Sequence, residues 1–222
     1  SEDEQKLDYA CVQAAVADLG DEQGKLQILA ALTRLRQVCC DPGLCFENFE
    51  GPTSKLDACV ELCEAMAENG HQILLFSQFT SMLDRLRERL DALHISNFTL
   101  QGSTPKEKRA AMVKAFNAGS ASVFLISLKA GGTGLNLTAA DIVIHYDPWW
   151  NQAAQDQATD RAHRIGQQAH VQVYKLIAKD TIEERILKLQ NRKLALLDTI
   201  SGCEEAGILN MSSEELLSLL KS

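Results

Sequence analysis

Apolar runs and amphipathic stretches alternate through the middle of this chain. Between residues 54 and 178, runs such as 72–77 are followed by a polar turn and then by hydrophobic residues at helical spacing. Strands that alternate with helices in this way form a parallel sheet with helices on both faces, so we predict an α/β fold. The predicted strands cover residues 72–77, 98–100, 123–126, 142–145 and 171–177; a helix over 54–68 precedes the first strand, and helices over 81–93 and 105–117 separate the next ones.

Helical patterns without strands flank this region on both sides. Residues 2–40 contain two stretches with apolar residues at helical spacing, which predict two amphipathic helices. The second of these helices ends at Asp41-Pro42-Gly43. Thr181 is placed to cap a long helix over 182–199, and a short amphipathic helix is predicted over 213–220. We therefore expect three parts: a helical linker over 1–53, the α/β lobe over 54–180, and a C-terminal helix and tail over 181–222.

The charge of the chain is unevenly distributed. The net charge is −8, which taken alone argues against a nucleic-acid partner. Residues 101–175, however, hold 8 Lys and Arg against 5 Asp and Glu, and this is the only net-positive third. A local basic surface on an acidic body is compatible with phosphate binding.

Composition also narrows the cellular setting. The seven cysteines form no CxxC pair, which favours buried, reduced thiols over a zinc site or disulfides, and no metal site is predicted. No run of 18 apolar residues or signal peptide is present, so no membrane partner is expected. The opening Ser1 suggests a cut within a longer protein. The lack of basic targeting runs favours a bacterial, nucleoid-associated cytoplasmic location over a nuclear one.

Polar segments follow the predicted strands where the strands end. Ligands of parallel α/β sheets bind outside the carboxyl ends of the strands, which lie along one edge. We therefore expect one shared site formed by four segments: 77–78, 102–104, 129–136 and 147–151.

A polar helical segment after the last of these loops carries Gln157, Arg161 and Arg164 at spacings of four and three residues. All three share one helix face. Two guanidinium groups near a glycine-rich loop suit a nucleotide triphosphate. The alternative is a pair of surface arginines that bridge Asp156 or Asp160.

The glycine-rich segment does not fit a dinucleotide-binding fingerprint, because Leu137 stands where the third glycine of GxGxxG belongs. The other function of such a turn is close approach to a sugar-phosphate backbone, with N–H groups and Lys129 as phosphate ligands.

Two long segments carry a family resemblance. SLKAGGTGLNL (127–137) and DQATDRAHRIGQ (156–167) resemble motifs V and VI of the SWI/SNF-type ATPases, a branch of the superfamily II helicase-like motors. LTRLRQVCCDPGL (32–44) resembles the segment that precedes their second motor lobe. The resemblance covers about residues 35–195 and implies a RecA-like (P-loop NTPase-like) second lobe, with a C-terminal brace helix after it.

The resemblance also assigns roles to residues. It implies that Arg161 and Arg164 are arginine fingers, supported by Gln157, and that Gly132, Gly134 and Asn136 lie on the nucleotide side. Trp150 stands at the DxxWN position, against the DNA minor groove, and we expect the additional Trp149 to be the buried one. The implied DNA contacts are Ser77, Gln78, Gly102, Ser103, Thr104, Lys129, Gly131, Trp150 and Asn151.

The chain has no GxxxxGK[ST] loop, and no DE pair follows an apolar strand. ATP and Mg²⁺ are therefore expected to bind mostly to an absent N-terminal RecA-like lobe, and the isolated chain should not hydrolyse ATP. The predicted function is the C-terminal motor lobe of an ATP-dependent double-stranded DNA translocase, and DNA-bound proteins are a further class of partner that this function allows. The alternatives are a non-catalytic binding scaffold with the same fold and a lobe of a strand-separating helicase.

Overall fold

The computed structural model describes residues 22–47, 49, 51–131, 135–149, 152–160 and 171–197. The chain divides into two compact units. The unit that we call the sheet unit consists of Leu56–Asp147 and Ala153–Leu176. The other, which we call the helix unit, consists of Ser1–Lys55, Pro148–Gln152 and Ile177–Ser222.

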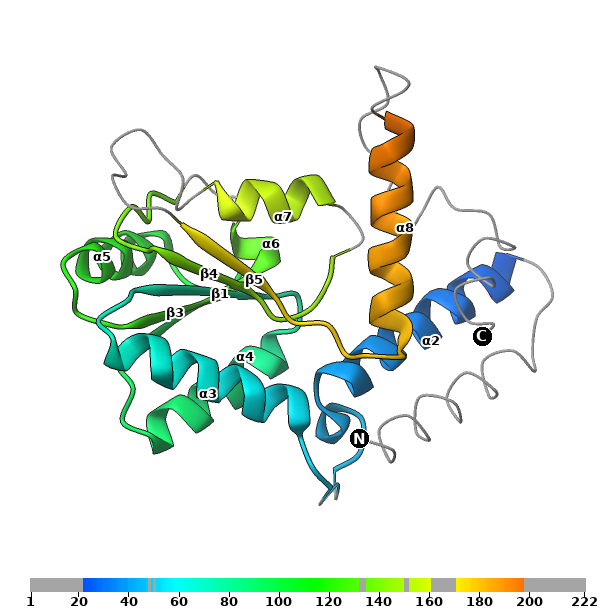
Figure 1. Ribbon diagram of the computed structural model, residues 1–222, viewed down its shortest axis with the longest axis horizontal. Helices are drawn as coiled ribbons and strands as arrows, with labels where there is room; N and C mark the ends of the chain where they lie inside the picture. The colour runs from blue at the N-terminus through cyan, green and yellow to red at the C-terminus, as the bar shows by residue number, and fades with distance from the viewer. Residues whose placement is uncertain are drawn as a thin grey trace. The chain divides into compact units, whose positions relative to one another are not determined.

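The sheet unit contains five parallel strands in the order β2-β3-β1-β4-β5 (Figure 1). In the central pair Ile73 lies opposite Val123, and on its other side β1 places Phe76 opposite His145. The chain leaves β1 for the far edge at β2 and then returns across the sheet. The strands are β1 (Ile73–Ser77), β2 (Asn97–Leu100), β3 (Val123–Ser127), β4 (Ile142–His145) and β5 (Gln172–Lys175).

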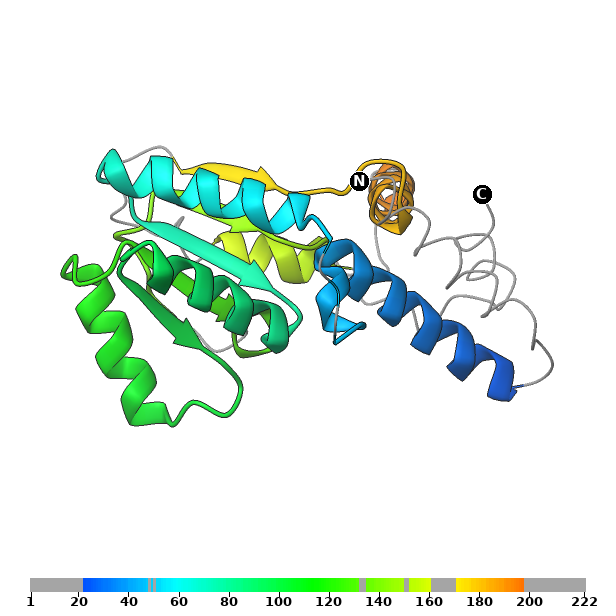
Figure 2. The ribbon, with the colours of Figure 1, turned by 90° about the horizontal axis from the view of Figure 1, so that it is seen from below.

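Helices cover both faces of this sheet. Figures 1 and 2 show α3 and α4 on one face, and α6 and α7 lie on the other. This arrangement follows from the right-handed crossover rule, because the β1-to-β2 connection runs in the opposite direction from the later ones. The helices are α3 (Ser54–Glu68), α4 (Thr80–Ala92), α5 (Lys106–Asn117), α6 (Leu128–Gly131) and α7 (Gln152–Thr159).

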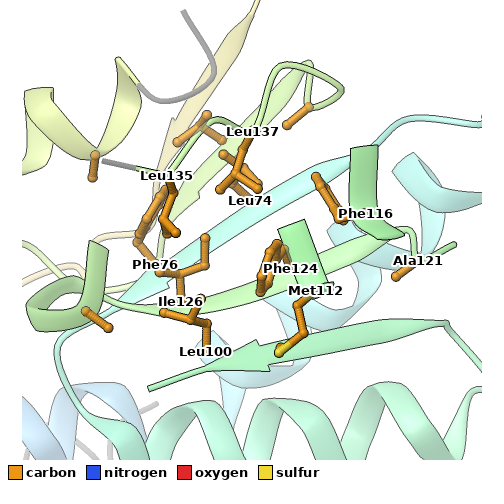
Figure 3. Close-up of a cluster of buried hydrophobic side chains, with 14 residues drawn as sticks. Leu74, Phe76, Leu100, Met112, Phe116, Ala121, Phe124, Ile126, Leu135 and Leu137 are labelled. Carbon is orange, nitrogen blue, oxygen red and sulfur yellow. The ribbon is translucent and has the colours of Figure 1, made fainter. Parts of the chain in front are cut away.

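Alternate residues of the central strands fill the two layers between sheet and helices. Phe76 and Phe124 point toward α5, where Phe116 packs at 5.2 Å between ring centroids from Phe124 (Figure 3). The neighbouring residues along the same strands, such as Leu75 and Leu125, are buried against the opposite face of the sheet. All positions of β1, β3 and β4 are buried, as a parallel sheet covered on both faces requires.

The helix unit is built around α2 (Glu22–Cys40) and α8 (Ile182–Leu197), which contact each other. The buried face of α2 carries Ile28, Leu32 and Leu35 at helical spacing. Asp41 ends α2, and its side chain accepts a hydrogen bond from the Gly43 N–H at the start of the short helix η1 (Pro42–Leu44). Thr181 Oγ1 accepts from the Glu183 N–H, so the predicted cap of α8 is confirmed.

The predicted α/β fold with a covered parallel sheet is confirmed, with one local difference. Residues 130–136 were expected to form a turn directly after β3, but the chain first makes the helical turn α6. Ala130 on this turn is buried in the core against the sheet, which explains why the segment starts as helix despite its glycines. The predicted helices before residue 22 and over 213–220 lie outside the described residues.

Candidate nucleic-acid site at the carboxyl edge of the sheet

The carboxyl ends of the strands in the sheet unit meet along one edge, because all five strands run in the same direction. The loop after β1 leads to α4 on one face, whereas β3 continues directly into α6 and the loop after β4 leads to α7 on the other face. Loops that diverge in this way leave a crevice at the strand ends, which is where ligands of such sheets bind. Polar segments follow β1, β2 and β4 at this edge, and the helical turn α6 follows β3 directly.

The loop after β1 is held by the carboxylate of Asp147 at the end of β4. Ser77 Oγ donates to Asp147 Oδ1 at 2.5 Å, and the Gln78 N–H donates to the same oxygen at 3.2 Å. Ser77 also accepts from the Phe79 N–H. Both Ser77 and Asp147 are completely buried, so this network is internal support for the loop.

This geometry changes the interpretation of the first predicted DNA contact. The Ser77 hydroxyl is enclosed and bonded, and in this arrangement it presents no surface to a phosphate. Gln78 is only half-buried, so its side chain is the accessible polar group of the pair. Ser77 was expected to contact DNA, because hydroxyl groups bind phosphates. In the structure its hydroxyl donates a hydrogen bond to the buried carboxylate of Asp147, 70 residues away in the sequence.

The turn after β2 is shaped by a residue that the sequence did not single out. Arg109 on α5 donates through Nε to the Thr104 carbonyl at 2.7 Å and through Nη2 to the Gly102 carbonyl at 2.7 Å. Thr104 Oγ1 accepts from the Gln101 N–H, which closes the turn. Gly102 and Ser103 remain exposed. Arg109 thus holds the backbone of this turn against the start of α5.

A groove of about 520 Å³ opens beside this turn. Its rim carries Lys106, Arg109 and the Thr104 hydroxyl, and Asn136 from the loop after α6 closes the other side. Asn136 is exposed, and its carbonyl accepts from Asn117 at 2.8 Å. The apolar residues that line the groove are Ala110, Val113 and Leu135. Asn136, expected on the nucleotide side, lines the same groove as Thr104, and its carbonyl is bonded to Asn117 at the opposite end of α5 from the turn.

The remaining predicted site residues are described only in part. Gln157 is exposed on α7, and Gly131 ends α6, where Lys129 also lies. Gly132, Gly134, Trp150, Asn151, Arg161 and Arg164 lie outside the described residues. Trp149, expected to be buried, is only half-buried.

The position of α7 against the sheet depends on His145, a second residue that the sequence reading did not use. His145 Nε2 lies 2.9 Å from Thr159 Oγ1, whose own proton goes to the Gln155 carbonyl at 3.1 Å. Thr159 therefore accepts, and Nε2 carries the imidazole proton. The ring stacks on Phe76 at 5.6 Å between centroids. Burial first, and then the charge of Lys175, lowers the pKa of His145 to about 4 against a smaller opposing effect of Asp156.

Two absences concern only the described part of the chain. Within it, no three His, Cys, Asp or Glu side chains lie close enough together to hold a metal ion. Five cysteines lie in the described residues, and four of them, Cys39, Cys40, Cys59 and Cys63, are buried. No described helix is long and apolar enough to cross a membrane.

Known proteins with similar sequences include two instructive relatives. An uncharacterized ATP-dependent helicase of Mycoplasma pneumoniae is 39% identical over 204 residues, covering 90% of this chain and 19% of the relative. SWI/SNF-related matrix-associated actin-dependent regulator of chromatin subfamily A member 1 of Mus musculus is 38% identical over 194 residues, covering 82% of this chain and 18% of the relative. The chain spans about a fifth of the length of these relatives.

Solved structures agree with the sequence comparison. The Sulfolobus solfataricus SWI2/SNF2 ATPase C-terminal domain aligns with a TM-score of 0.78 and 28% identity, over 100% of this chain and 94% of that one. The SWI2/SNF2 ATPase core of the same organism, in complex with dsDNA, aligns with a TM-score of 0.78 and 30% identity, over 99% of this chain and 47% of that one. The helicase conserved C-terminal domain family matches residues 54–166. The chain therefore belongs to the helicase conserved C-terminal domain family, and its relatives are ATP-dependent helicases of the SWI/SNF type.

Proposed function

We propose that this chain supplies the second motor lobe of an ATP-dependent translocase that moves on double-stranded DNA. Residues 54–180 would form the lobe, 1–53 a linker to a first RecA-like lobe, and 181–222 a brace helix and tail. The observation that carries the proposal is the groove beside the turn after β2, where the cationic side chains of Lys106 and Arg109 lie close to the exposed residues Gly102 and Ser103. A similar ATPase core has been solved in complex with dsDNA, which supports the same class of ligand.

The groove explains how DNA would be held without regard to sequence. Lys106, the Thr104 hydroxyl and the Asn136 amide are groups that contact phosphate and sugar. Ser103 is exposed at the tip of the same turn. Such contacts position a backbone but read no bases, as a motor that must release and rebind requires. We therefore place Asn136 with the DNA contacts instead of the nucleotide contacts.

ATP hydrolysis would need groups from both lobes. We propose that Arg161 and Arg164 stabilise the charge that develops on the transferred phosphoryl group when the lobes close, and that Gln157 assists from the same helix. The sequence contains no GxxxxGK[ST] loop, so we propose that a first lobe binds most of the nucleotide and its metal. The chain alone should therefore not hydrolyse ATP.

The test is a comparison of ATPase rates in a protein that joins this chain to its first lobe. Arg164→Ala should lower the DNA-stimulated rate by about 10³-fold or more, because an arginine finger contributes roughly 10³–10⁵ in rate. Arg87→Ala is the matched control: Arg87 is exposed on α4 and lies 3.5 Å from Asp84 of the same helix. Its rate should equal that of the wild type.

Each rival predicts a different result in the same assay. A wild-type rate that duplex DNA does not raise would support the binding scaffold and reject the motor. Separation of a labelled duplex into single strands, coupled to hydrolysis, would support the strand-separating helicase. Equal ATPase rates for the wild type and Arg164→Ala would show that Arg164 has no catalytic role. Translocation would then be tested separately, by measuring whether the protein moves along one strand of the duplex.

A further inference from the structure

Within the helix unit, two consecutive carbonyl groups accept hydrogen bonds from two different helices. Arg36 Nη2 on α2 donates to the Pro148 carbonyl at 2.5 Å. Gln190 Nε2 on α8 donates to the Trp149 carbonyl. The donors are 112 and 41 residues away from their acceptors, so neither contact is a local turn. The backbone of Pro148 and Trp149 is therefore held from two sides.

The burial of Arg36 indicates that its hydrogen bond to the Pro148 carbonyl does more than pack α2 against its neighbours. Arg36 is only 2% exposed, although a guanidinium stays charged and is costly to remove from water. The other buried positions of α2 are uncharged, and most of them, such as Leu32 and Leu35, are aliphatic. A charged donor adds a directional bond to a carbonyl, which an aliphatic side chain cannot provide.

Helix α8 is fixed at its start, which gives Gln190 a defined position. Lys55 Nζ lies 2.5 Å from Glu183 Oε2, and Glu183 is completely buried. The same carboxylate accepts from the Ala178 N–H at 2.8 Å. Glu183, Ile186 and Gln190 follow one another at spacings of three and four residues, so they share one face of α8. Gln190 is 4% exposed on this buried face.

We propose that Arg36 and Gln190 are positioning residues that hold the Pro148–Trp149 backbone and thereby set the path of the chain into Trp150 and Asn151. This inference rests on the proposed function, because Trp150 and Asn151 are the residues for which DNA contact is predicted. It assigns the linker helix α2 and the brace helix α8 a direct role in DNA affinity. Neither Arg36 nor Gln190 touches DNA or nucleotide in this scheme.

The chain provides its own reporter for this backbone, because Trp149 and Trp150 are its only tryptophans. In the 222-residue chain, Arg36→Met and Gln190→Met should shift tryptophan emission to longer wavelength and increase quenching by acrylamide. The matched controls are Arg34→Met and Asn191→Met, which make the same replacement at exposed positions of the same two helices. Both controls should keep the wild-type emission.

The functional readout uses the protein that joins this chain to its first lobe. Arg36→Met and Gln190→Met should each raise the KM for duplex DNA by about tenfold, because a lost buried hydrogen bond to a charged or backbone group changes an equilibrium by roughly that factor. The rate at saturating DNA should stay within about twofold, since no group at the phosphates is altered. Arg36→Lys, which keeps a donor, should recover part of the affinity.

Variants that melt at lower temperature but keep the wild-type emission and the wild-type KM for DNA would overturn the proposal, because Arg36 and Gln190 would then only stabilise packing. If Arg36→Met does not fold, Gln190→Met and Arg36→Lys decide the question by the same two readouts. If duplex DNA does not raise the ATPase rate of the wild type, the proposed function is refuted. The comparison of tryptophan emission would still support or overturn the proposal that Arg36 and Gln190 position the Pro148–Trp149 backbone.

Discussion

At the scale of single residues, the carboxyl edge depends on a buried acid that the sequence does not reveal as important. Asp147 accepts bonds from the Ser77 hydroxyl and from the Gln78 N–H, and it is completely enclosed. An enclosed carboxylate is stable only when its hydrogen bonds are made. Ser77 is therefore expected to matter for folding, in contrast to the exposed Ser103 on the neighbouring turn.

Ser77→Ala should lower the free energy of unfolding by about 1–3 kcal/mol, because it removes a donor from a buried charged acceptor. Chemical denaturation monitored by circular dichroism measures this change. Ser103→Ala, the same replacement at an exposed position, should stay within about 0.5 kcal/mol of the wild type. Equal stability of Ser77→Ala and the wild type would show that water or another group replaces the hydroxyl.

Long-range partners of this kind explain where sequence reasoning stopped. The sequence correctly predicted that polar residues lie at the ends of the strands. Which of these side chains point inward depends on contacts between β1 and β4, and the sequence does not reveal those contacts. The same holds for Arg36 and Pro148, which are 112 residues apart. Periodicity reports burial within one element and contains no information about the partner of a buried polar group.

At the scale of elements, the turn after β2 and helix α5 form one structure, because Arg109 connects them. Its guanidinium donates to the carbonyls of Thr104, Gly102 and Gln101, the last at 3.3 Å. The Thr104 N–H donates back to the Gln101 carbonyl at 3.0 Å. The turn that we propose to contact DNA is therefore rigid before DNA arrives.

Arg109→Met should loosen this turn while leaving α5 helical. Amide hydrogen exchange at Gln101 and Thr104 should accelerate by about tenfold, since the bonds from the guanidinium contribute on the order of 1.4 kcal/mol to local stability. Lys108→Met, an exposed cation on the same helix, serves as the control. Unchanged exchange in Arg109→Met would mean that the Thr104 hydroxyl alone closes the turn.

The boundaries of the strands were predicted most accurately where the strand is buried on both faces. Strands β1, β3 and β4 were predicted within about one residue, because strands buried on both faces appear as continuous apolar runs. The last strand was predicted over 171–177 but covers Gln172–Lys175, and its residues are mostly exposed at the edge of the sheet. The helical turn α6 was missed because its glycines indicate a turn locally, whereas packing of Ala130 determines the outcome.

At the scale of the whole molecule, the order of the strands could not be derived from periodicity. Alternation of strands and helices predicts a covered parallel sheet, but not that β1 lies at its centre between β3 and β4. That central position places the ends of β1 and β4 together and so creates the Asp147 network. It also places His145 beside Phe76, where the imidazole is buried under α7.

The stability of the fold should depend on this imidazole as pH falls. The pKa of His145 is lowered from 6.5 to about 4, so the unfolded chain binds a proton more readily than the folded chain. The contribution of the neutral ring is complete above pH 6.5 and is lost as pH falls toward 4, a change of about 3 kcal/mol. Unfolding free energies measured between pH 7 and 4.5 test this expectation.

The comparison variant for this titration is His145→Gln, which keeps a donor for Thr159 and cannot be protonated. Its stability should fall less than that of the wild type over the same pH interval. His94→Gln, at an exposed position, should reproduce the wild-type profile. Identical slopes for wild type and His145→Gln would mean that the ring is hydrated enough to keep its ordinary pKa.

The placement of the cysteines has a kinetic consequence. Cys39 and Cys40 are buried in the helix unit, and Cys59 and Cys63 are buried on α3 in the sheet unit. A thiol reagent reacts only when a local opening brings the sulfur to solvent, so the labelling rate at each cysteine measures the opening of its own unit. Mass spectrometry of the labelled peptides can thus follow the two units separately in one sample, and the order in which they open becomes directly observable.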